Sequence, residues 1–197
     1  LRPGGLATIF GLSREEVQAI CEEVSDFEVV NVAVHNAPNQ FVISGDMAPL
    51  EKAMALSKQR GARAIKLPIS VPGHTPVMRD AADEMERILL RTSFRDPNAP
   101  IVSNIHGGLL VTAEDVRAEL GGQICAAVEW VRCMGSMVNE GVATFVEIGP
   151  GRALSNIAGR FGDNLRFLTV EDAQDHDLLS LSLPSIDPKP SSSPAPA

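Results

Sequence analysis

The chain has 197 residues, of which 44% are hydrophobic and 21% are charged, a balance typical of a globular protein with one domain or two small ones. Its 17 basic and 25 acidic side chains give a net charge of −8, which argues against nucleic acid or an anionic membrane as the main partner. No apolar run approaches the roughly 18–20 residues that a membrane helix requires, and the three widely spaced cysteines predict buried thiols in a reducing, cytoplasmic compartment.

Two strand–helix–strand units are predicted in the first third of the chain. In order, the pattern predicts a strand over 5–12, a helix from Ser13 to near Val24, strands over 28–35 and 40–45, a helix from Met47 to near Gly61, and a strand over 62–67. This β-α-β-β-α-β order is typical of a ferredoxin-like module, and we assign residues 1–68 to a small subdomain of that kind. Because a strand begins so close to Leu1, which is not Met, we also expect the chain to be a fragment of a longer protein.

Strands and helices alternate in the second part of the chain. The predicted elements are a helix from Thr75-Pro76 to beyond Ile88, a strand over 101–105, helices over 113–120 and 123–140, a strand over 144–148, a helix through Leu154 and Ile157, and a strand over 165–170. This alternation predicts an α/β domain with a parallel sheet over 69–172. Five of the 14 prolines lie in the last 14 residues, and residues 173–197 are therefore predicted to be a flexible tail or linker.

His74 is the histidine whose position suggests chemistry. It follows Pro72-Gly73 in a loop that leads straight into a helix, where the partial positive charge of the helix N-terminus favours a neutral imidazole able to accept a proton. The simpler alternative is that His74 only caps this helix. His35 and His176 are interpreted as structural or solvated. His106 ends a predicted strand beside Gly107-Gly108 and could line a pocket, but nothing near it in the sequence completes a site.

Other catalytic and metal-binding motifs are missing from the sequence. The histidines and cysteines lack HxxxH, HExxH and CxxC spacings, so no metal site is predicted. The run Glu147-Ile148-Gly149-Pro150-Gly151-Arg152 could place N–H groups at a phosphate, but a tight structural turn is the favoured interpretation. No Gly-x-Ser-x-Gly nucleophile elbow occurs in the 197 residues.

Six segments together carry a resemblance to a known family. They are Gly4–Leu12, Val34–Gly45, Pro68–Met78, Pro100–Asn104, Gln123 with Val128-Glu129-Trp130, and Phe145–Leu154. In this order they resemble malonyl-CoA:acyl-carrier-protein transacylase and the related acyltransferase domains of polyketide and fatty-acid synthases, over roughly residues 4–170.

The resemblance implies an α/β-hydrolase-like domain with an inserted ferredoxin-like subdomain, and a ping-pong transfer of malonyl from coenzyme A to an acyl carrier protein. The family's nucleophilic serine and its carboxylate-binding arginine would lie upstream of Leu1. By similarity, His74 is the general base for that serine, and the backbone carbonyl of Gln123 holds His74 in place of the aspartate of a triad. Coenzyme A thioester is then a substrate, and no cofactor is implied.

Three further expectations follow from the resemblance. The residue before the histidine is often Phe or Ser and gauges the acyl group, so Gly73 leaves room for malonyl or a branched acyl group. Asn36 is expected to form a turn first and to line the pocket second. Because carrier proteins are acidic, Lys58, Arg60, Arg63 and Lys66 are the candidate docking residues. The alternative function is that of an inactive homologue, or of a ferredoxin-like module that binds or regulates a carrier protein.

Overall fold

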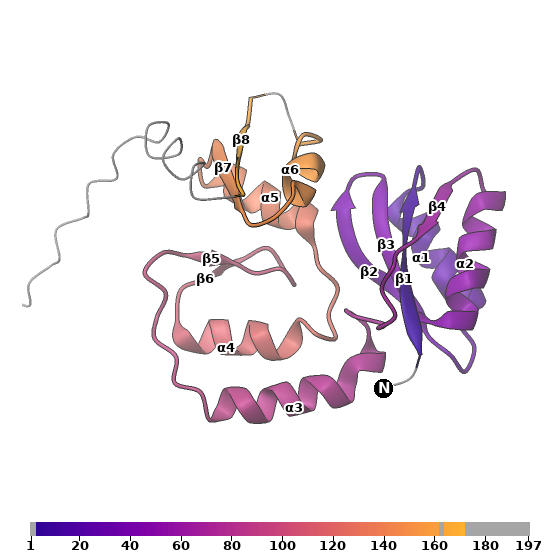
Figure 1. The fold of residues 1–197 in the computed structure, drawn as a ribbon, viewed down its shortest axis with the longest axis horizontal. Helices are drawn as coiled ribbons and strands as arrows, with labels where there is room; N and C mark the ends of the chain where they lie inside the picture. The colour runs from indigo at the N-terminus through magenta and orange to yellow at the C-terminus, as the bar shows by residue number, and fades with distance from the viewer. Residues whose placement is uncertain (1–2, 162–163, 172–197) are drawn as a thin grey trace, which may run out of the picture. The chain divides into compact units, whose positions relative to one another are not determined.

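The computed structural model describes residues 3–161 and 164–171, and the fold is mixed α/β (Figure 1). The chain divides into two compact units, Leu1–Val142 and Ala143–Ala197. None of the helices in the described ranges combines the length and the apolarity that crossing a membrane requires. The predicted tail over 173–197, and His176 within it, lie outside the described residues.

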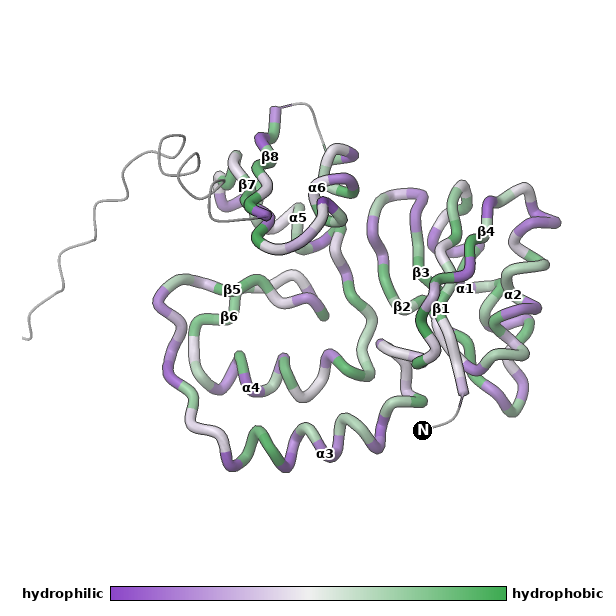
Figure 2. The backbone as a smooth tube through the Cα atoms, in the orientation of Figure 1, coloured by the Kyte–Doolittle hydropathy of each residue, from purple (hydrophilic) through white to green (hydrophobic). Residues whose placement is uncertain are grey.

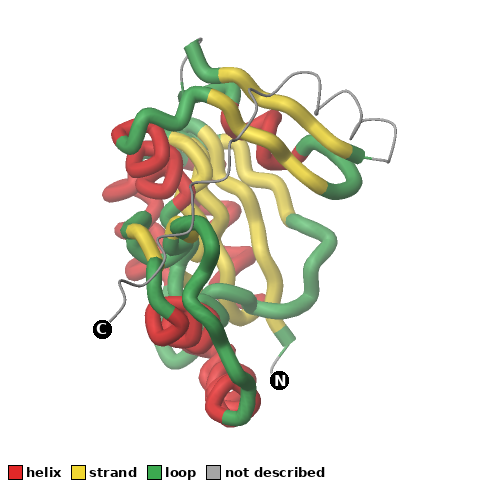
Figure 3. Tube along the Cα trace, turned by 90° about the vertical axis from the view of Figure 1, so that its left-hand side faces the viewer, coloured by secondary structure: helices red, strands yellow, loops and turns green. Residues whose placement is uncertain are grey.

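The first unit begins with a four-stranded sheet and two helices, in the predicted β-α-β-β-α-β order. The elements are β1 (Gly4–Phe10), α1 (Arg14–Val24), β2 (Val30–Ala37), β3 (Gln40–Asp46), α2 (Met47–Gln59) and β4 (Arg63–Lys66). The strands lie in the order β2-β3-β1-β4, and every neighbouring pair is antiparallel. Figure 3 shows strands in yellow running side by side, with helices in red. We refer to these six elements as the βαββαβ module. The expected capping box of α1 is present, since Ser13 and Glu16 each accept the other's backbone N–H.

The core of this module explains why these residues form these elements. Alternate residues of the strands, such as Ile9 in β1 and Ile43 in β3, point to one face and are fully buried there. The apolar stripes of α1 and α2, represented by Ile20 and Leu50, pack against the same face. The apolar residues that recur every second position in the strands and every three to four positions in the helices therefore pack together in one continuous core.

The rest of the first unit is built from short strands and four helical segments. These are a 3₁₀ turn over Pro76–Met78, α3 (Arg79–Leu90), β5 (Ile101–Val102), β6 (Leu109–Leu110), α4 (Ala113–Gly122) and α5 (Trp130–Asn139). Strands β5 and β6 form an antiparallel pair, and α3 packs against α4. Apolar and polar residues alternate along α3 in Figure 2, as its predicted amphipathic stripe requires.

Two predicted elements differ from the structure in this region. The predicted helix over 123–140 begins only at Trp130, because residues 123–129 leave α4 and run to the edge of β2. There the backbone N–H of Val128 donates to Ala33 O and its carbonyl accepts from His35 N, each at 2.8 Å. The four-residue spacing between Ile124 and Val128 resembles one face of a helix, but Val128 instead pairs with the edge of a sheet. The predicted strand over 101–105 ends at Val102, since Ser103 begins a tight turn.

The second unit contains a parallel strand pair and one short helix among its described residues. Strand β7 (Thr144–Ile148) pairs with β8 (Arg166–Val170), and α6 (Ala153–Ala158) lies between them in the chain. Phe145 and Phe167 stack with their ring centroids 5.1 Å apart. This pair has the parallel arrangement predicted for 69–172, whereas β5 and β6 are antiparallel.

Candidate active site

The loop before α3 holds His74 in an unusual backbone conformation. His74 has φ +61°, and among the described residues it is the one non-glycine with a positive φ. The loop is fixed from within, because the fully buried Thr75 donates its hydroxyl to Pro72 O at 2.7 Å. The backbone N–H of Gly73 donates to Val71 O at 2.9 Å.

Two hydrogen bonds tie His74 to the residues that follow α4. Its Nδ1 lies 2.8 Å from the backbone oxygen of Gln123, and its backbone N–H donates to Ile124 O at 3.0 Å. A carbonyl oxygen can only accept, so Nδ1 carries the proton and the lone pair of a neutral ring is on Nε2. The structure therefore brings together the predicted pair, His74 and Gln123, although 49 residues separate them in the chain.

The acceptor of this bond is available because of where it lies in α4. Gln123 is the C-cap of α4, so its carbonyl lies beyond the last intrahelical hydrogen bonds. Carbonyls at a helix C-terminus carry partial negative charge, which favours a bound N–H and any positive charge that develops on the ring. The side chain of Gln123 takes no part in this contact.

The two predicted substrate-binding residues lie in different environments. A Cβ placed on Gly73 would meet no atom within 4 Å, so the space next to His74 is open. Asn36 lies within β2, at an irregularity in its register, and not in the following turn, which is formed by Pro38 and Asn39. The expectation that Asn36 forms the turn was therefore wrong, and among the described residues no hydrogen bond joins Asn36 to His74.

The four candidate docking cations lie at the end of α2 and on β4. Three of them contact side chains of the same module: Arg60 pairs with Glu23 at 2.5 Å, Lys66 pairs with Glu51 at 3.1 Å, and the Arg63 guanidinium lies 5.8 Å from the centroid of Phe10. Lys58 is exposed in the last turn of α2. The positive charge of this surface is therefore partly balanced by neighbouring carboxylates.

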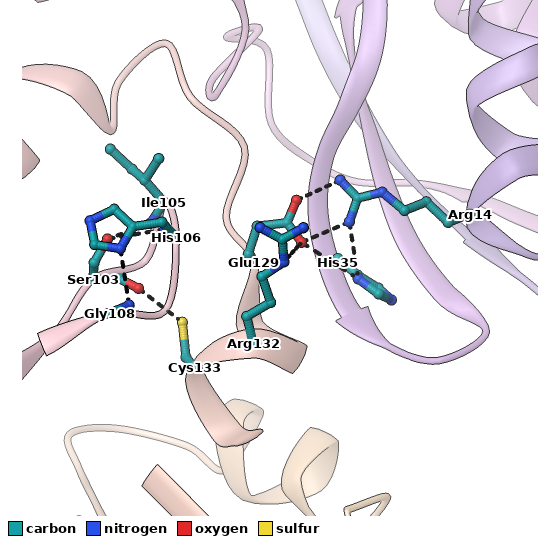
Figure 4. A network of polar contacts seen from close by, with 9 residues as sticks. All are labelled: Arg14, His35, Ser103, Ile105, His106, Gly108, Glu129, Arg132 and Cys133. Atoms are coloured by element: carbon teal, nitrogen blue, oxygen red, sulfur yellow. Dashed lines mark hydrogen bonds and ion pairs between the residues drawn. The ribbon is translucent and has the colours of Figure 1, made fainter. Parts of the chain in front are cut away.

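An ionic cluster around one buried carboxylate, which sequence reasoning missed, lies at the start of α5 (Figure 4). Glu129 is only 6% exposed, and both of its oxygens accept from Arg14, at 2.7 and 2.6 Å. Its carboxylate also lies 3.6 Å from His35 Nδ1 and 3.9 Å from Arg132 Nε. The hydrogen bonds from Arg14 hold the pKa of Glu129 below its usual value.

Nothing in the sequence marks this cluster in advance. Arg14 occupies the first turn of a helix, where a charged residue usually faces solvent, and 115 residues separate it from Glu129. Val128-Glu129-Trp130 is part of the family resemblance, but the pattern does not indicate that the carboxylate is buried. Only the tertiary contact between α1 and the start of α5 makes Glu129 and Arg14 partners.

A second polar cluster fixes the turn after β5 against α4. Glu119 accepts from Ser103 Oγ at 2.6 Å and from the backbone N–H of Asn104 at 2.7 Å. The buried Cys133 thiol donates to Ser103 O at 3.2 Å, and burial raises its pKa to about 11. Burial also raises the pKa of the Cys21 thiol, to about 12. Both thiols are therefore protonated near neutral pH, as expected for buried cysteines, whereas Cys125 is half-buried.

The remaining candidate motifs do not form a ligand site in the part of the chain that the structure describes. Glu147 accepts from the backbone N–H groups of Leu154 and Ser155, at 2.9 and 2.8 Å, so its carboxylate already occupies the donors at the start of α6. This favours the structural interpretation of the glycine-rich turn. No cluster of His, Cys, Asp and Glu in the described ranges could hold a metal ion.

A histidine held through Nδ1 by a backbone carbonyl has its Nε2 lone pair available to accept a proton, which is the chemistry that a general base requires. The described residues place this histidine on a mixed α/β fold.

Comparison with known proteins finds similar sequences of one kind. No family model matches the chain. It is 32% identical over 177 residues to the malonyl CoA-acyl carrier protein transacylase of Bacillus subtilis, covering 89% of this chain and 56% of that protein. It is 34% identical over 163 residues to the transacylase of the same name from Escherichia coli K12, covering 82% and 53%.

Solved structures agree with these relatives. The malonyl-CoA:acyl carrier protein transacylase of Xanthomonas oryzae matches with a TM-score of 0.87 and 32% identity, over 91% of this chain and 58% of that one. A malonyl-transacylase solved with a type II polyketide-synthase acyl-carrier protein matches with a TM-score of 0.84 and 33% identity, over 88% and 56%. The chain is therefore similar to part of the malonyl CoA-acyl carrier protein transacylases, and it spans about half the length of the curated relatives it matches.

Proposed function

We propose that the chain supplies the histidine side of the active site of a cytoplasmic acyltransferase. This enzyme would move a malonyl or related acyl group from coenzyme A to the phosphopantetheine thiol of an acyl carrier protein. The observation that carries the proposal is the 2.8 Å contact between His74 Nδ1 and the carbonyl of Gln123, in a chain whose relatives are malonyl CoA-acyl carrier protein transacylases.

In this proposal the fold has two parts. The βαββαβ module is a ferredoxin-like small subdomain over 1–68, and residues 69–172 are the C-terminal part of an α/β-hydrolase-like domain. The strand order β2-β3-β1-β4 supports the first assignment. The parallel pairing of β7 with β8 supports the second.

In the proposed reaction, Nε2 of His74 acts first as a general base and then as a general acid. A serine from polypeptide outside the 197 residues attacks the thioester carbon while His74 Nε2 takes its proton, and the proton then passes to the departing sulfur of coenzyme A. In the second half, Nε2 takes the proton of the phosphopantetheine thiol, which attacks the acyl-serine, and the serine oxygen is reprotonated. Throughout, the carbonyl of Gln123 keeps the Nδ1 proton in place.

This role for Gln123 predicts unequal effects of two alanine substitutions. In an enzyme completed by the serine-bearing segment, His74→Ala should lower kcat/KM by about 10³-fold or more, because the general base is lost. Gln123→Ala should stay within about tenfold of the parent, because alanine keeps the carbonyl that His74 uses. Steady-state kinetics with malonyl-CoA and carrier protein would measure both, and equal losses would contradict the assignment.

The 197-residue chain alone is expected to form no acyl-enzyme, because the nucleophile is assigned elsewhere. Incubation with radiolabelled malonyl-CoA followed by mass spectrometry tests this directly. A covalent adduct on the chain would place the nucleophile within it. If a serine-completed protein also forms no adduct, a carrier-binding or regulatory module becomes the better description.

The similarity to the transacylases is also the basis for proposing an acyl pocket and a surface that binds the carrier protein. Gly73 and Asn36 are proposed to contact the acyl group, and the open space beside Gly73 supports acceptance of malonyl or a branched group. Lys58, Arg60, Arg63 and Lys66 are proposed to meet the acidic carrier.

Charge reversal at an exposed cation tests the carrier surface. Lys58→Glu should raise the KM for carrier protein several-fold without changing the rate at which the acyl-enzyme is hydrolysed by water. The matched control is Arg87→Glu, on the exposed surface of α3, where Arg87 pairs with Glu84. Equal changes in KM for the two variants would contradict the assignment.

A further inference from the structure

The segment from Gln123 to Glu129 connects the acceptor of His74 to the βαββαβ module. At its start, Gln123 and Ile124 offer their carbonyls to His74. At its end, Val128 exchanges two backbone hydrogen bonds with β2, and Glu129 N–H donates to Asn104 O at 2.7 Å. Six residues of chain therefore join the carbonyl that orients the histidine to the contacts with β2 and Asn104.

The ionic cluster adds a side-chain link at the end of the segment. The Glu129 carboxylate receives both arms of the Arg14 guanidinium, and Arg14 belongs to the first turn of α1 in the βαββαβ module. Such two-pronged pairs restrict direction as well as distance. His35 of β2 and Arg132 of α5 also face the carboxylate, at 3.6 and 3.9 Å, so groups from three elements converge on it (Figure 4).

We propose that Glu129, held by Arg14, is a positioning residue for His74. The pair fixes the end of the segment 123–129 against α1 and β2, and this keeps the carbonyl of Gln123 where Nδ1–H of His74 can donate to it. The meaning of this role for catalysis rests on the proposed function, whereas the positioning itself is a property of the 197-residue chain.

Because the Glu129 carboxylate is buried, its contact with Arg14 is sensitive to the loss of the guanidinium. The Glu129 carboxylate is 6% exposed, whereas the Arg14 side chain is 40% exposed. Removing Arg14 leaves a buried carboxylate without its two-pronged partner, so the structure must admit water or shift, and removing the carboxylate releases Arg14 from the end of the segment. The N–H and carbonyl groups of Val128 lie next to this carboxylate in the chain, and within the described ranges Gln123 O is the one acceptor that His74 Nδ1 contacts. The tautomer of His74 should therefore respond to substitutions at Arg14 and Glu129.

The test uses the 197-residue chain and follows the ring of His74 by ¹⁵N NMR. The signals are assigned by their loss in His74→Ala. The parent should show the proton on Nδ1, and in Glu129→Gln and Arg14→Gln the Nδ1–H fraction should fall at least twofold. Hydrogen exchange at the His74 and Val128 amides should accelerate at least tenfold, and Arg14→Lys, which keeps the charge but not the two-pronged geometry, should lie in between.

Arg60→Gln is the matched control, because it breaks the Arg60–Glu23 ion pair within the same module but far along the chain from Glu129. It should leave both readouts unchanged. The proposal is overturned if folded Arg14→Gln and Glu129→Gln variants keep the parent tautomer and exchange rates. If the single variants do not fold, the double variant Arg14→Gln/Glu129→Gln leaves neither charge buried alone, and an unchanged tautomer there also overturns it.

The readouts separate this inference from the proposed function. Tautomer and exchange are measured without acyl transfer, so they stay informative if the activity is a different one. In a serine-completed enzyme, Glu129→Gln should lower kcat while the KM for carrier protein stays within twofold of the parent. A tautomer shift without acyl transfer in the parent would reject the proposed function and keep the positioning role.

Discussion

His74 and His35 show how environment separates two histidines that look alike in the sequence. His74 lies at a loop and is tied through Nδ1 to a carbonyl, whereas His35 lies on β2 and stacks on Phe41 with the ring centroids 4.5 Å apart. The family resemblance predicted the partner of His74, and local pattern predicted a structural role for His35. Neither could reveal that His35 faces Glu129, because that contact requires α1, β2 and the start of α5 to be assembled.

His35 should make stability depend on pH in a defined window. Burial, followed by the nearby charge of Arg14, lowers the pKa of His35 below its usual value of 6.5, although Glu129 opposes this. The unfolded chain then binds a proton more readily than the native protein does. The free energy of unfolding should therefore rise with pH from the native pKa up to about 6.5, and level off above it.

Urea unfolding at several pH values between about 5 and 8 would measure this dependence. His35→Gln should flatten the rise. Parallel curves for the parent and His35→Gln would contradict the role of His35.

At the scale of elements, the sequence pattern predicted the βαββαβ module well and the later segments less well. Every residue of β3 and nearly every residue of β1 is buried, so these strands are identified by short apolar runs between turn signals and not by alternation with exposed residues. The segment 123–129 has apolar residues at a spacing of four, yet it is a connection that meets a sheet edge at Val128. Its backbone hydrogen bonds go to Ala33 and His35, and such distant partners leave no local pattern.

Two glycines in different elements should respond oppositely to alanine. In β3, a Cβ on Gly45 would lie 2.0 Å from Val29 O, so Gly45→Ala should destabilise the protein by about 3 kcal/mol through displacement of backbone. In α5, a Cβ on the exposed Gly135 meets nothing within 4 Å, so Gly135→Ala should stabilise by about 0.5–1 kcal/mol. Urea unfolding of both variants measures these changes, and a neutral Gly45→Ala would show that β2 and β3 separate easily there.

At the scale of the whole molecule, the proposed catalytic geometry belongs to one compact unit. The hydrogen bonds that hold His74, Gln123 and Glu129 all have both partners within Leu1–Val142. The core of the βαββαβ module lies in the same unit. The sequence predicted the strands and helix of the second unit, but the division of the chain after Val142 follows from contacts and has no marker in composition.

A chain that ends at Val142 should therefore fold and keep the site. We expect it to retain the far-UV circular dichroism of a mixed α/β protein and the Nδ1–H signal of His74, because no hydrogen bond described for that ring involves residues after 142. Circular dichroism and ¹⁵N NMR of the shortened chain provide the measurement. Loss of cooperative unfolding would show that residues 143–197 are needed for the first unit to fold.

The left-handed backbone of His74 also affects how the protein can be engineered. A side chain with a Cβ adopts φ +61° at a cost of about 1–2 kcal/mol, which glycine avoids and asparagine tolerates better. Selection for folding stability alone would consequently favour replacement of the histidine. A thermostability screen on this chain would then enrich sequences that have lost the proton acceptor, unless every round also selects for turnover.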